Sequence, residues 1–273
     1  MNRDAPIGVF DSGFGGLSAA RELRRLLPGE DLVYFGDNAR IPYGDRSPDT
    51  ITEYSLQDAA FLLSKGVKAI LVACGTVSSV ALDTLRERSP VPVEGVIEPA
   101  VREALRISKN GVVGVIGTNA TVRSGAYARA VSRISGGEVK AVSVPCPLLV
   151  PLVENGYVDD GCLITRLAVR EYLEPLKAAG ADCIILGCTH YPLIRGIIAS
   201  EWGRDELVNT GLEGARALEA TLRREGALRS GGAGKLSLYS SDRSDFFGRQ
   251  ASLFLGEECP GFERVDITRV RGL

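Results

Sequence analysis

Two cysteines stand at similar places in the chain, each at the end of a short apolar run. Cys74 ends KAILVAC, Cys188 ends ADCIILGC, and a threonine follows each within two residues. A thiol beside the amides that open a helix can have its pKa lowered from about 8.5 toward 7, which makes it a proton acceptor. A single buried cysteine is more often a small hydrophobe, but a pair at equivalent positions favours a chemical role.

Two further groups could assist these thiols. The chain has one histidine, His190, two residues after Cys188 in GCTHYP, where a hydrogen bond or a positive charge would favour the thiolate. Asp11 ends the apolar run IGVFD, where its carboxylate can orient or deprotonate a neighbouring group, cap the following helix, or do both. The remaining cysteines lack a partner motif and are assigned to structure: Cys146, Cys162, Cys183 and Cys259.

Two facing thiols can carry out a reaction without a metal or an organic cofactor. A thiolate on one face of a carbon acid removes its proton while a thiol on the other face delivers one, so the stereocentre is inverted. Positioned proton transfer is worth roughly 10²–10⁴ in rate, and preorganised donors that stabilise the carbanion must supply the rest. The residues therefore predict a racemase or an epimerase.

Glycine-rich and hydroxyl-rich loops follow several of the apolar runs. DSGFGG resembles a phosphate-binding loop, but it has neither the GxxxxGK nor the GxGxxG spacing, so a plain strand-to-helix turn explains it equally well. IPYGDRS and GTNAT offer amides and hydroxyls to a small carboxylate substrate, or are simply turns.

The elements that position these residues alternate along the chain. Short apolar runs cover residues 7–11, 32–37, 68–74, 91–97, 111–117, 139–146, 181–188 and 235–241. Stretches with helical spacing cover residues 17–27, 50–66, 78–88, 121–134 and 162–180. Strand followed by helix, repeated, predicts an α/β fold with mostly parallel sheets flanked by helices.

The chain also repeats itself at long range. IGVFDSG is similar to VGVIGTNAT, and AILVACGT is similar to CIILGCTH, in the same order. We therefore expect two similar α/β domains with the active site in the cleft between them. The first comprises residues 1–97 plus 208–273 and carries Asp11 and Cys74, and the second comprises residues 98–207 and carries Cys188 and His190.

Composition excludes several classes of protein. Lys and Arg total 32 against 34 Asp and Glu, for a net charge of −2, which argues against a basic nucleic-acid binder. No apolar run approaches the 18 or so residues of a membrane helix, and the N-terminus lacks a secretory apolar core. Six cysteines without a CxxC pair give neither a disulfide framework nor a zinc ribbon. We expect a cytoplasmic protein with a small-molecule substrate, no nucleic-acid or membrane partner, and a homodimer as the default assembly.

A series of segments, in one order, resembles the glutamate racemases of the aspartate/glutamate racemase superfamily. They are FDSGFGGLS, YFGDNARIPYG, VACGTVSS, GVIEPA, GVIGTNATVRSGAY, CPLLVPLVENG and ILGCTHYPLI, spanning about residues 7 to 195. The resemblance implies interconversion of L- and D-glutamate without a cofactor or a metal, supplying D-glutamate for peptidoglycan. It implies that Cys74 and Cys188 are the acid/base thiols, that Asp11 assists the first, and that His190 and the nearby Glu154 assist the second. The substrate-binding residues that it implies are Asp11, Ser12, Tyr43, Gly44, Gly75, Thr76, Thr118, Thr121, Thr189 and His190.

This chain departs from the family pattern at two positions. It reads CGTVS where members usually read CNTAS, so Gly75 lacks an amide side chain that would contact the amino acid. Losing one or two hydrogen bonds, each worth about 0.5–1.5 kcal/mol, predicts weaker binding or a shifted substrate preference. Asn209 stands where an acidic residue is common. A racemase for aspartate or another amino acid therefore stays open, as does a phosphate- or nucleotide-binding protein that uses DSGFGG.

Overall fold

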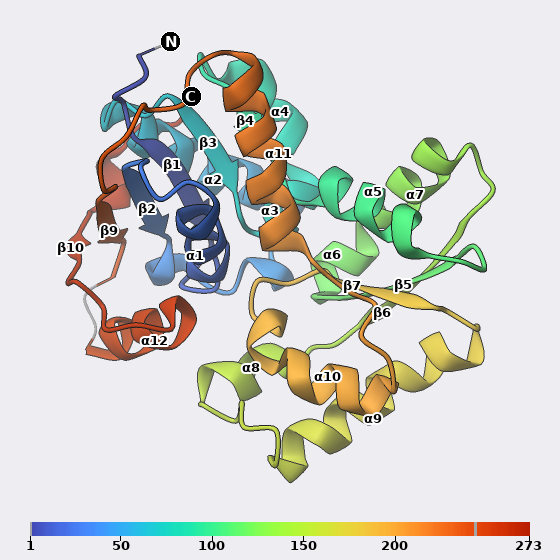
Figure 1. Ribbon diagram of the computed structural model, residues 1–273. Helices are drawn as coiled ribbons and strands as arrows, with labels where there is room; N and C mark the ends of the chain where they lie inside the picture. The colour runs from blue at the N-terminus through green and yellow to red at the C-terminus, as the bar shows by residue number, and fades with distance from the viewer. Residues whose placement is uncertain (1, 243–244) are drawn as a thin grey trace.

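The computed structural model describes residues 2–242 and 245–273, which form two parallel sheets flanked by helices (Figure 1). The strand order is β10-β9-β2-β1-β3-β4 in the first sheet and β6-β5-β7-β8 in the second. Every strand pairing within these sheets is parallel. The predicted α/β fold class is therefore confirmed.

The first sheet takes its six strands from two distant stretches of the chain. They are β1 (Ile7–Asp11), β2 (Leu32–Gly36), β3 (Ala69–Val72), β4 (Val93–Glu94), β9 (Leu236–Ser240) and β10 (Glu263–Arg264). Alternate residues face opposite sides, so that Ile7 and Val9 join one apolar cluster while Phe10 joins another. The first cluster includes α1 (Leu17–Leu26), α11 (Thr210–Arg224) and α12 (Asp245–Leu255), and the second includes α2 (Pro48–Ser64), α3 (Gly75–Val80) and α4 (Leu82–Arg88).

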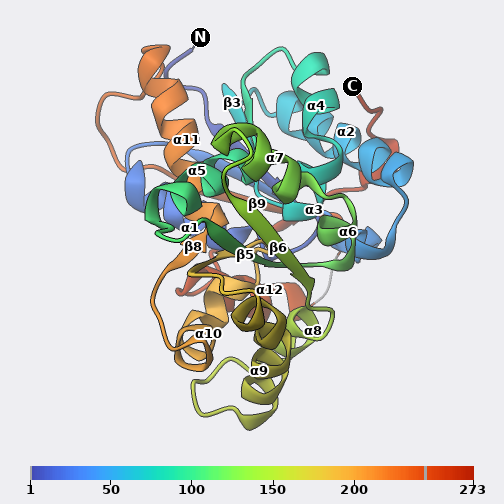
Figure 2. The ribbon, with the colours of Figure 1, turned by 90° about the vertical axis from the view of Figure 1, so that its right-hand side faces the viewer.

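The second sheet comes from one continuous stretch and is also covered on both faces (Figure 2). Its strands are β5 (Val112–Gly117), β6 (Lys140–Pro145), β7 (Cys183–Leu186) and β8 (Leu207–Asn209). One face packs on α5 (Ile97–Ile107) and α7 (Ala126–Ser135), and the other on α9 (Leu163–Ala178) and α10 (Arg195–Trp202). The shorter elements are α6 (Asn119–Arg123), α8 (Leu149–Glu154) and 3₁₀ turns at Asn38–Arg40, Tyr43–Asp45, Tyr191–Ile194 and Ile267–Arg269.

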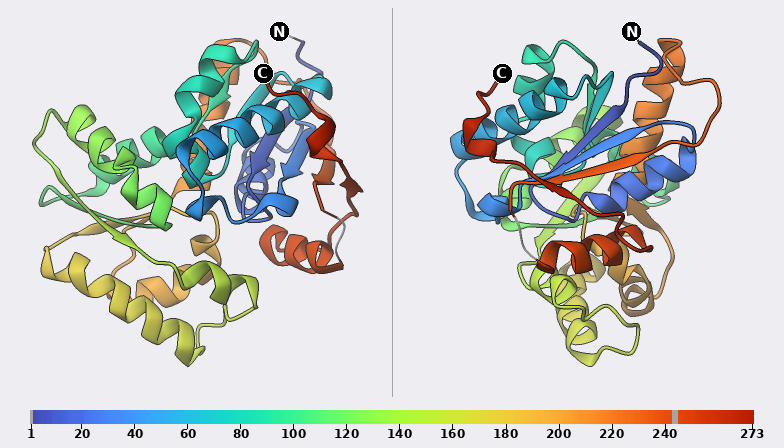
Figure 3. Two further views of the ribbon diagram at one scale, coloured as in Figure 1. Left: turned by 180° about the vertical axis from the view of Figure 1, so that it is seen from behind. Right: turned by 90° about the vertical axis from the view of Figure 1, so that its left-hand side faces the viewer.

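The chain passes from the first sheet to the second through α5 and returns through α11. After that return β9 pairs with β2, so the C-terminal segment rejoins the first sheet (Figure 3). Strands before residue 97 and after residue 235 lie in the first sheet, and strands between residues 112 and 209 lie in the second. The division into domains at residues 97 and 208 stays a prediction.

Several element boundaries differ from those expected from the sequence. The helix expected over 121–134 is divided into α6 and α7, because Gly125 adopts a left-handed conformation with φ of 64°. The helix expected over 78–88 is divided into α3 and α4 at Ala81, whose φ is −114°. The strand expected over 91–97 is paired only at Val93–Glu94, since α5 begins at Ile97. Apolar periodicity identified these segments but did not find their internal breaks.

Side-chain caps fix the starts of three helices. Ser47 caps α2 and Thr118 caps α6, each accepting a hydrogen bond from the amide three residues on. Asn209 caps α11, and its side-chain oxygen accepts from the amides of Gly211 (3.0 Å) and Leu212 (3.3 Å). Asn and Asp both serve as caps, so an amide can fill this position as an acidic residue would.

Across the described residues, every helix is too short or too polar to cross a membrane.

Candidate active site

A cavity of about 320 Å³ lies where the strand ends of the two sheets meet. Its walls follow the carboxyl ends of β1, β3, β5 and β7, the edge at which open parallel sheets bind ligands. Every site residue expected from the sequence lines it except Thr121: Asp11, Ser12, Tyr43, Gly44, Cys74, Gly75, Thr76, Thr118, Glu154, Cys188, Thr189 and His190. The fold therefore brings these residues together from both sheets.

Cys74 lies on the side of the cavity built by the first sheet. It follows β3 and occupies the N-cap position of α3, with its Sγ 3.5 Å from Ser12 Oγ. Asp11 ends the neighbouring strand β1, and its Oδ1 accepts a hydrogen bond from the Gly13 amide at 2.9 Å. Asp11 does not cap α1, whose N-cap residue is Gly16. Its buried Oδ2 has no hydrogen-bond partner among the described residues, so it can accept one from a ligand.

The electrostatics around Cys74 differ from the sequence expectation. Burial, followed by the charge of Asp11, raises the pKa of the Cys74 thiol to about 12, although Cys74 opens a helix. Burial likewise raises the pKa of Asp11, against the opposing effect of His190. The expectation of a lowered pKa was wrong for Cys74, because desolvation and a nearby carboxylate outweigh one turn of helix amides. Cys74 is therefore a protonated thiol at neutral pH.

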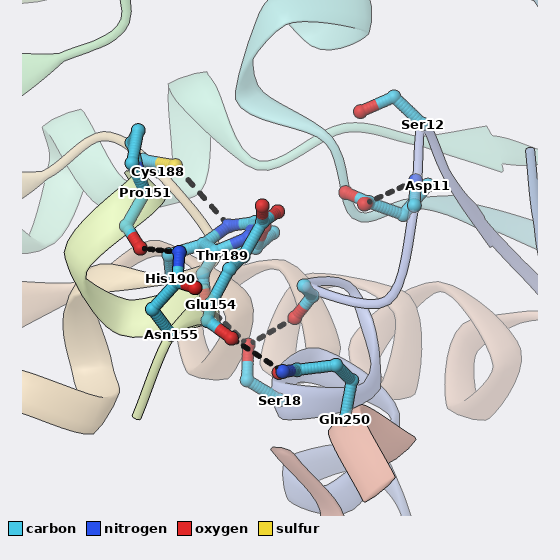
Figure 4. A network of polar contacts seen from close by, with 12 residues as sticks. Asp11, Ser12, Ser18, Pro151, Glu154, Asn155, Cys188, Thr189, His190 and Gln250 are labelled. Atoms are coloured by element: carbon cyan, nitrogen blue, oxygen red, sulfur yellow. Dashed lines mark hydrogen bonds and ion pairs between the residues drawn. The ribbon is translucent and has the colours of Figure 1, made fainter. Parts of the chain in front are cut away.

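Cys188 lies on the opposite side, in a chain of three polar groups (Figure 4). Its Sγ is 3.6 Å from His190 Nδ1, and His190 Nε2 is 2.9 Å from Glu154 Oε1. Burial lowers the pKa of His190, but Cys188 and Glu154 outweigh it and raise that pKa to about 10. His190 is therefore an imidazolium at neutral pH, a cation beside the Cys188 sulfur.

Hydroxyl groups join the two halves of the cavity. Thr76, on α3, has its Oγ1 3.1 Å from that of Thr118 and 3.5 Å from that of Thr121, at the start of α6. Thr118 and Thr121 are themselves 3.0 Å apart. Thr121 does not line the cavity, but it orients the hydroxyls that do. These groups provide donors and acceptors for a ligand carboxylate.

Tyr43 is held by a buried charged cluster behind the cavity. Its hydroxyl donates to Asp37 and lies 3.1 Å from Asp58 Oδ2. Arg40 neutralises these acids, at 2.5 Å from Asp37 and 3.0 Å from Asp58. Burial, with Asp58 and Asp37 beside it, raises the pKa of Tyr43 well above its usual value, so the phenol stays neutral. The cluster fixes the loop that carries Tyr43 and Gly44.

Gly75, the first residue of α3, lies against the backbone that follows β7. A Cβ at this position would be 2.4 Å from the backbone oxygen of Gly187, the residue before Cys188. Real Cβ atoms do not approach backbone oxygens so closely, so a side chain would displace the end of β7. The space that an asparagine would use in this chain is thus occupied by the second half of the molecule.

The glycines of DSGFGG have a packing role. A Cβ at Gly15 would lie 2.2 Å from Thr189 Oγ1 and 2.6 Å from His190 Nδ1, and one at Gly16 would lie 2.5 Å from Asp11 Cβ. This packing accounts for both glycines without a bound phosphate. Among residues 2–242 and 245–273, no group of three or more His, Cys, Asp or Glu side chains could hold a metal ion.

Some cavity residues were not expected from the sequence. Cys146, assigned to structure above, follows β6 and lines the cavity, and burial raises the pKa of its thiol to about 12. Its place after a strand was a usable signal, but the flanking prolines and the lack of a repeated motif obscured it. The others are Gly13, Ile41, Pro42, Asp45, Asn119, Pro147, Val150, Pro151 and Gly187.

Comparisons with known proteins identify racemases as relatives of this chain. The family model described as Asp/Glu/Hydantoin racemase matches residues 7–218. A glutamate racemase from Geobacter metallireducens is 45% identical over 263 residues, covering 96% of each chain. The crystal structure of glutamate racemase from Francisella tularensis in complex with D-glutamate is similar with a TM-score of 0.90 and 36% identity, covering 97% of this chain and 98% of that one. The enzyme from Thermus thermophilus, in complex with β-chloro-D-alanine, is similar with a TM-score of 0.85 and 42% identity, with coverage of 97% and 98%.

Proposed function

We propose that this chain, which belongs to the Asp/Glu/Hydantoin racemase family, interconverts L- and D-glutamate by proton transfer between its two cavity thiols. Membership of the family makes it an isomerase. The observation that carries the proposal is that Cys74, which follows β3 of the first sheet, and Cys188, which follows β7 of the second, line one cavity. The names of relatives that match nearly the whole chain support glutamate as the substrate.

The substrate would be bound without basic side chains. None of the described residues that line the cavity is a lysine or an arginine, so the carboxylates of glutamate would meet hydroxyls and backbone amides. The hydroxyls are those of Ser12, Thr76, Thr118 and Thr189. The ammonium group of glutamate would lie beside Asp11 and donate a hydrogen bond to Oδ2, which has no partner among the described residues.

The proton would move in two balanced steps. When Cys188 acts as the base, its thiolate, beside the protonated His190, takes the α-proton from one face of glutamate, while the electron pair remains as a carbanion. Cys74, which starts as a thiol, donates its proton to the opposite face. The product is the other enantiomer, and the thiol and thiolate have exchanged places. The reverse reaction begins from that exchanged state.

Two buried features would lower the barrier. The hydroxyls of Thr76 and Thr118 are already oriented before substrate enters, so they stabilise developing charge without reorganising. The cavity lies between two sheets, which excludes most water and strengthens each electrostatic contact. In this scheme no cofactor or metal takes part.

The wider role follows from the product. We propose that the D-glutamate is used in peptidoglycan synthesis, so that a strain depleted of the enzyme should lose peptidoglycan precursor.

We also propose that the enzyme is cytoplasmic and a homodimer, which cell fractionation and sedimentation of the purified protein test. The proposed division into domains near residues 97 and 208 is tested by limited proteolysis near those boundaries.

The proposed function is tested with two variants, each of which replaces one cavity cysteine. Circular dichroism follows racemisation by each variant, starting from each enantiomer. Cys74→Ser and Cys188→Ser should each lower the rate by about 10²–10⁴, because a serine hydroxyl neither ionises nor donates at the required pKa. Cys183→Ser is the matched control, since Cys183 is buried in β7 away from the cavity. Full activity of either cavity variant in both directions would overturn the mechanism. A preference for aspartate in a panel of acids would change the substrate and leave the mechanism in place.

A further inference from the structure

We infer that Gly15, Gln250 and Phe254 are positioning residues that hold His190 and Glu154 in place for proton transfer at Cys188. Gly15 follows β1 of the first sheet, and Gln250 and Phe254 lie on α12, which packs on α1. Glu154 ends α8 and His190 follows β7, so both belong to the second half of the molecule. The role of His190 in catalysis rests on the proposed function, but its positioning can be tested without any substrate.

Phe254, on α12, forms one wall around the imidazole. Its ring centroid is 5.0 Å from that of His190, with the planes at 80°, so the rings meet edge to face. Phe254 is fully buried, and its ring also lies 6.3 Å from that of Phe14. A buried aromatic ring in this arrangement restricts rotation of the imidazole about its χ2 angle.

Gly15 forms a second wall. Its Cα lies so close to the imidazole that an added Cβ would be 2.6 Å from His190 Cε1. The Ser18 hydroxyl lies 2.8 Å from the Gly15 oxygen and 2.9 Å from the Thr189 oxygen, so it ties this loop to the segment carrying His190. The glycine-rich loop therefore contributes to catalysis by packing against the histidine.

Gln250, one turn before Phe254 on α12, holds Glu154 in place by a hydrogen bond to its backbone. Its Nε2 donates to the backbone oxygen of Glu154 at 2.5 Å (Figure 4). Glu154 is the last residue of α8, where carbonyl groups lack partners within the helix. Gln250 satisfies that carbonyl and fixes the point from which the Glu154 side chain reaches His190.

The chemistry requires this constraint. His190 contacts Cys188 through Nδ1 and Glu154 through Nε2, and both contacts depend on one ring orientation. A rotation of the ring would move Nδ1 away from the Cys188 sulfur and Nε2 away from the Glu154 carboxylate. The titratable groups that face His190 are Cys188 and Glu154 from the second half and Asp11 from the first.

The first test compares Phe254→Leu with Leu255→Ala, which removes a buried side chain from the same helix. We expect Phe254→Leu to lower kcat about 10-fold or more with KM changed less than 2-fold, because misplaced catalytic groups lose rate rather than binding. The α-deuterium isotope effect should rise for the enantiomer deprotonated by Cys188 and not for the other. Leu255→Ala should alter neither. Equal changes in both variants would mean that the helix matters only for stability, and would overturn the inference.

The second test uses the fact that His190 is the only histidine in the chain. Protein labelled with ¹³C at histidine Cε1 gives one resonance, whose position and pH titration report the imidazole directly. We expect Phe254→Leu and Gln250→Leu to move this resonance and its titration, and Leu255→Ala to leave both unchanged.

Gln250→Leu removes only one hydrogen bond from a side chain that is 6% exposed, so it keeps the inference testable where Phe254→Leu fails to fold. An unchanged histidine resonance in a folded Gln250→Leu protein would contradict the inference. Because the resonance needs no substrate, an inactive wild-type enzyme would refute the proposed function while leaving this result intact.

Discussion

The two cavity thiols have opposite electrostatic surroundings. Cys74 lies beside a buried carboxylate, Asp11, and burial with that charge raises the pKa of the thiol to about 12. Cys188 lies 3.6 Å from Nδ1 of a histidine that is protonated at neutral pH. The proposed proton transfer uses one thiol and one thiolate, and the two sulfurs differ accordingly in the charge beside them.

Glu154→Gln should lower the pKa of His190 from about 10, because the carboxylate at Nε2 is one of the charges that raise it. Loss of activity at alkaline pH should then begin about one pH unit lower, since a shift of this size is typical of one close charge. The pH profile of kcat/KM for both enantiomers measures this change.

The same substitution should change how stability depends on pH. A histidine whose pKa is raised from 6.5 to about 10 on folding contributes stability that is complete below 6.5 and is lost as the pH rises toward 10. Urea denaturation between about pH 8.5 and 10 should show falling stability in the wild type and a flatter curve in Glu154→Gln, in which the histidine loses its proton about one pH unit earlier. Identical slopes in the two proteins would show that Glu154 does not support the charge.

Gly75→Asn should impair the enzyme even though asparagine is usual in the family. The new Cβ would lie 2.4 Å from the Gly187 oxygen, and the end of β7 must move together with Cys188. We expect unfolding free energy to fall by about 1–3 kcal/mol, the usual cost of overpacking, with kcat reduced at least about 10-fold.

The control for Gly75→Asn is Gly161→Ala, where an added Cβ meets nothing within 4 Å. Urea denaturation and steady-state kinetics on both variants check the expectation. Tighter glutamate binding with undiminished kcat in Gly75→Asn would mean that the two sheets separate easily at this point.

At the scale of elements, Asn209 departs from the family pattern, and the sequence alone offered no reason for this residue. In the structure Asn209 is the N-cap of α11. Asn209 accepts from two amides at the start of this helix, which leads the chain from the second sheet back to the first. Asn209→Ala should lower the unfolding free energy by about 1 kcal/mol. Asn209→Asp should keep it or raise it by a few tenths, because a carboxylate interacts favourably with the helix dipole. Equal losses in both variants by urea denaturation would exclude a capping role.

Strands were easier to predict from this sequence than helix breaks. The apolar runs IGVFD and CIILGC are buried on both sides, and such continuous runs mark central parallel strands directly. The break at Gly125 depends on a backbone φ that a glycine permits but does not require. The short β4 and the start of α5 depend on tertiary pairing, which local periodicity does not contain.

At the scale of the whole molecule, the long-range repeat predicted two sheets, and the strand-end rule predicted which residues would meet. Those residues line one cavity between the sheets, with Thr121 behind it. The sequence could not predict the Gly187 oxygen against Gly75 or the contact of Phe254 with His190. Each of these depends on how the two halves dock, which no local pattern records.

In the proposed reaction, protons move to and from both faces of the substrate through two thiols. The most direct test is to incubate L-glutamate and D-glutamate separately with the enzyme in deuterated water, with no added cofactor or metal, and to follow α-deuterium by NMR and configuration by circular dichroism. Each enantiomer should give the other with deuterium at Cα, and early in the reaction the label should appear in product before it appears in remaining substrate. Rapid labelling of the starting enantiomer without inversion, or inversion without solvent deuterium, would overturn the two-thiol mechanism.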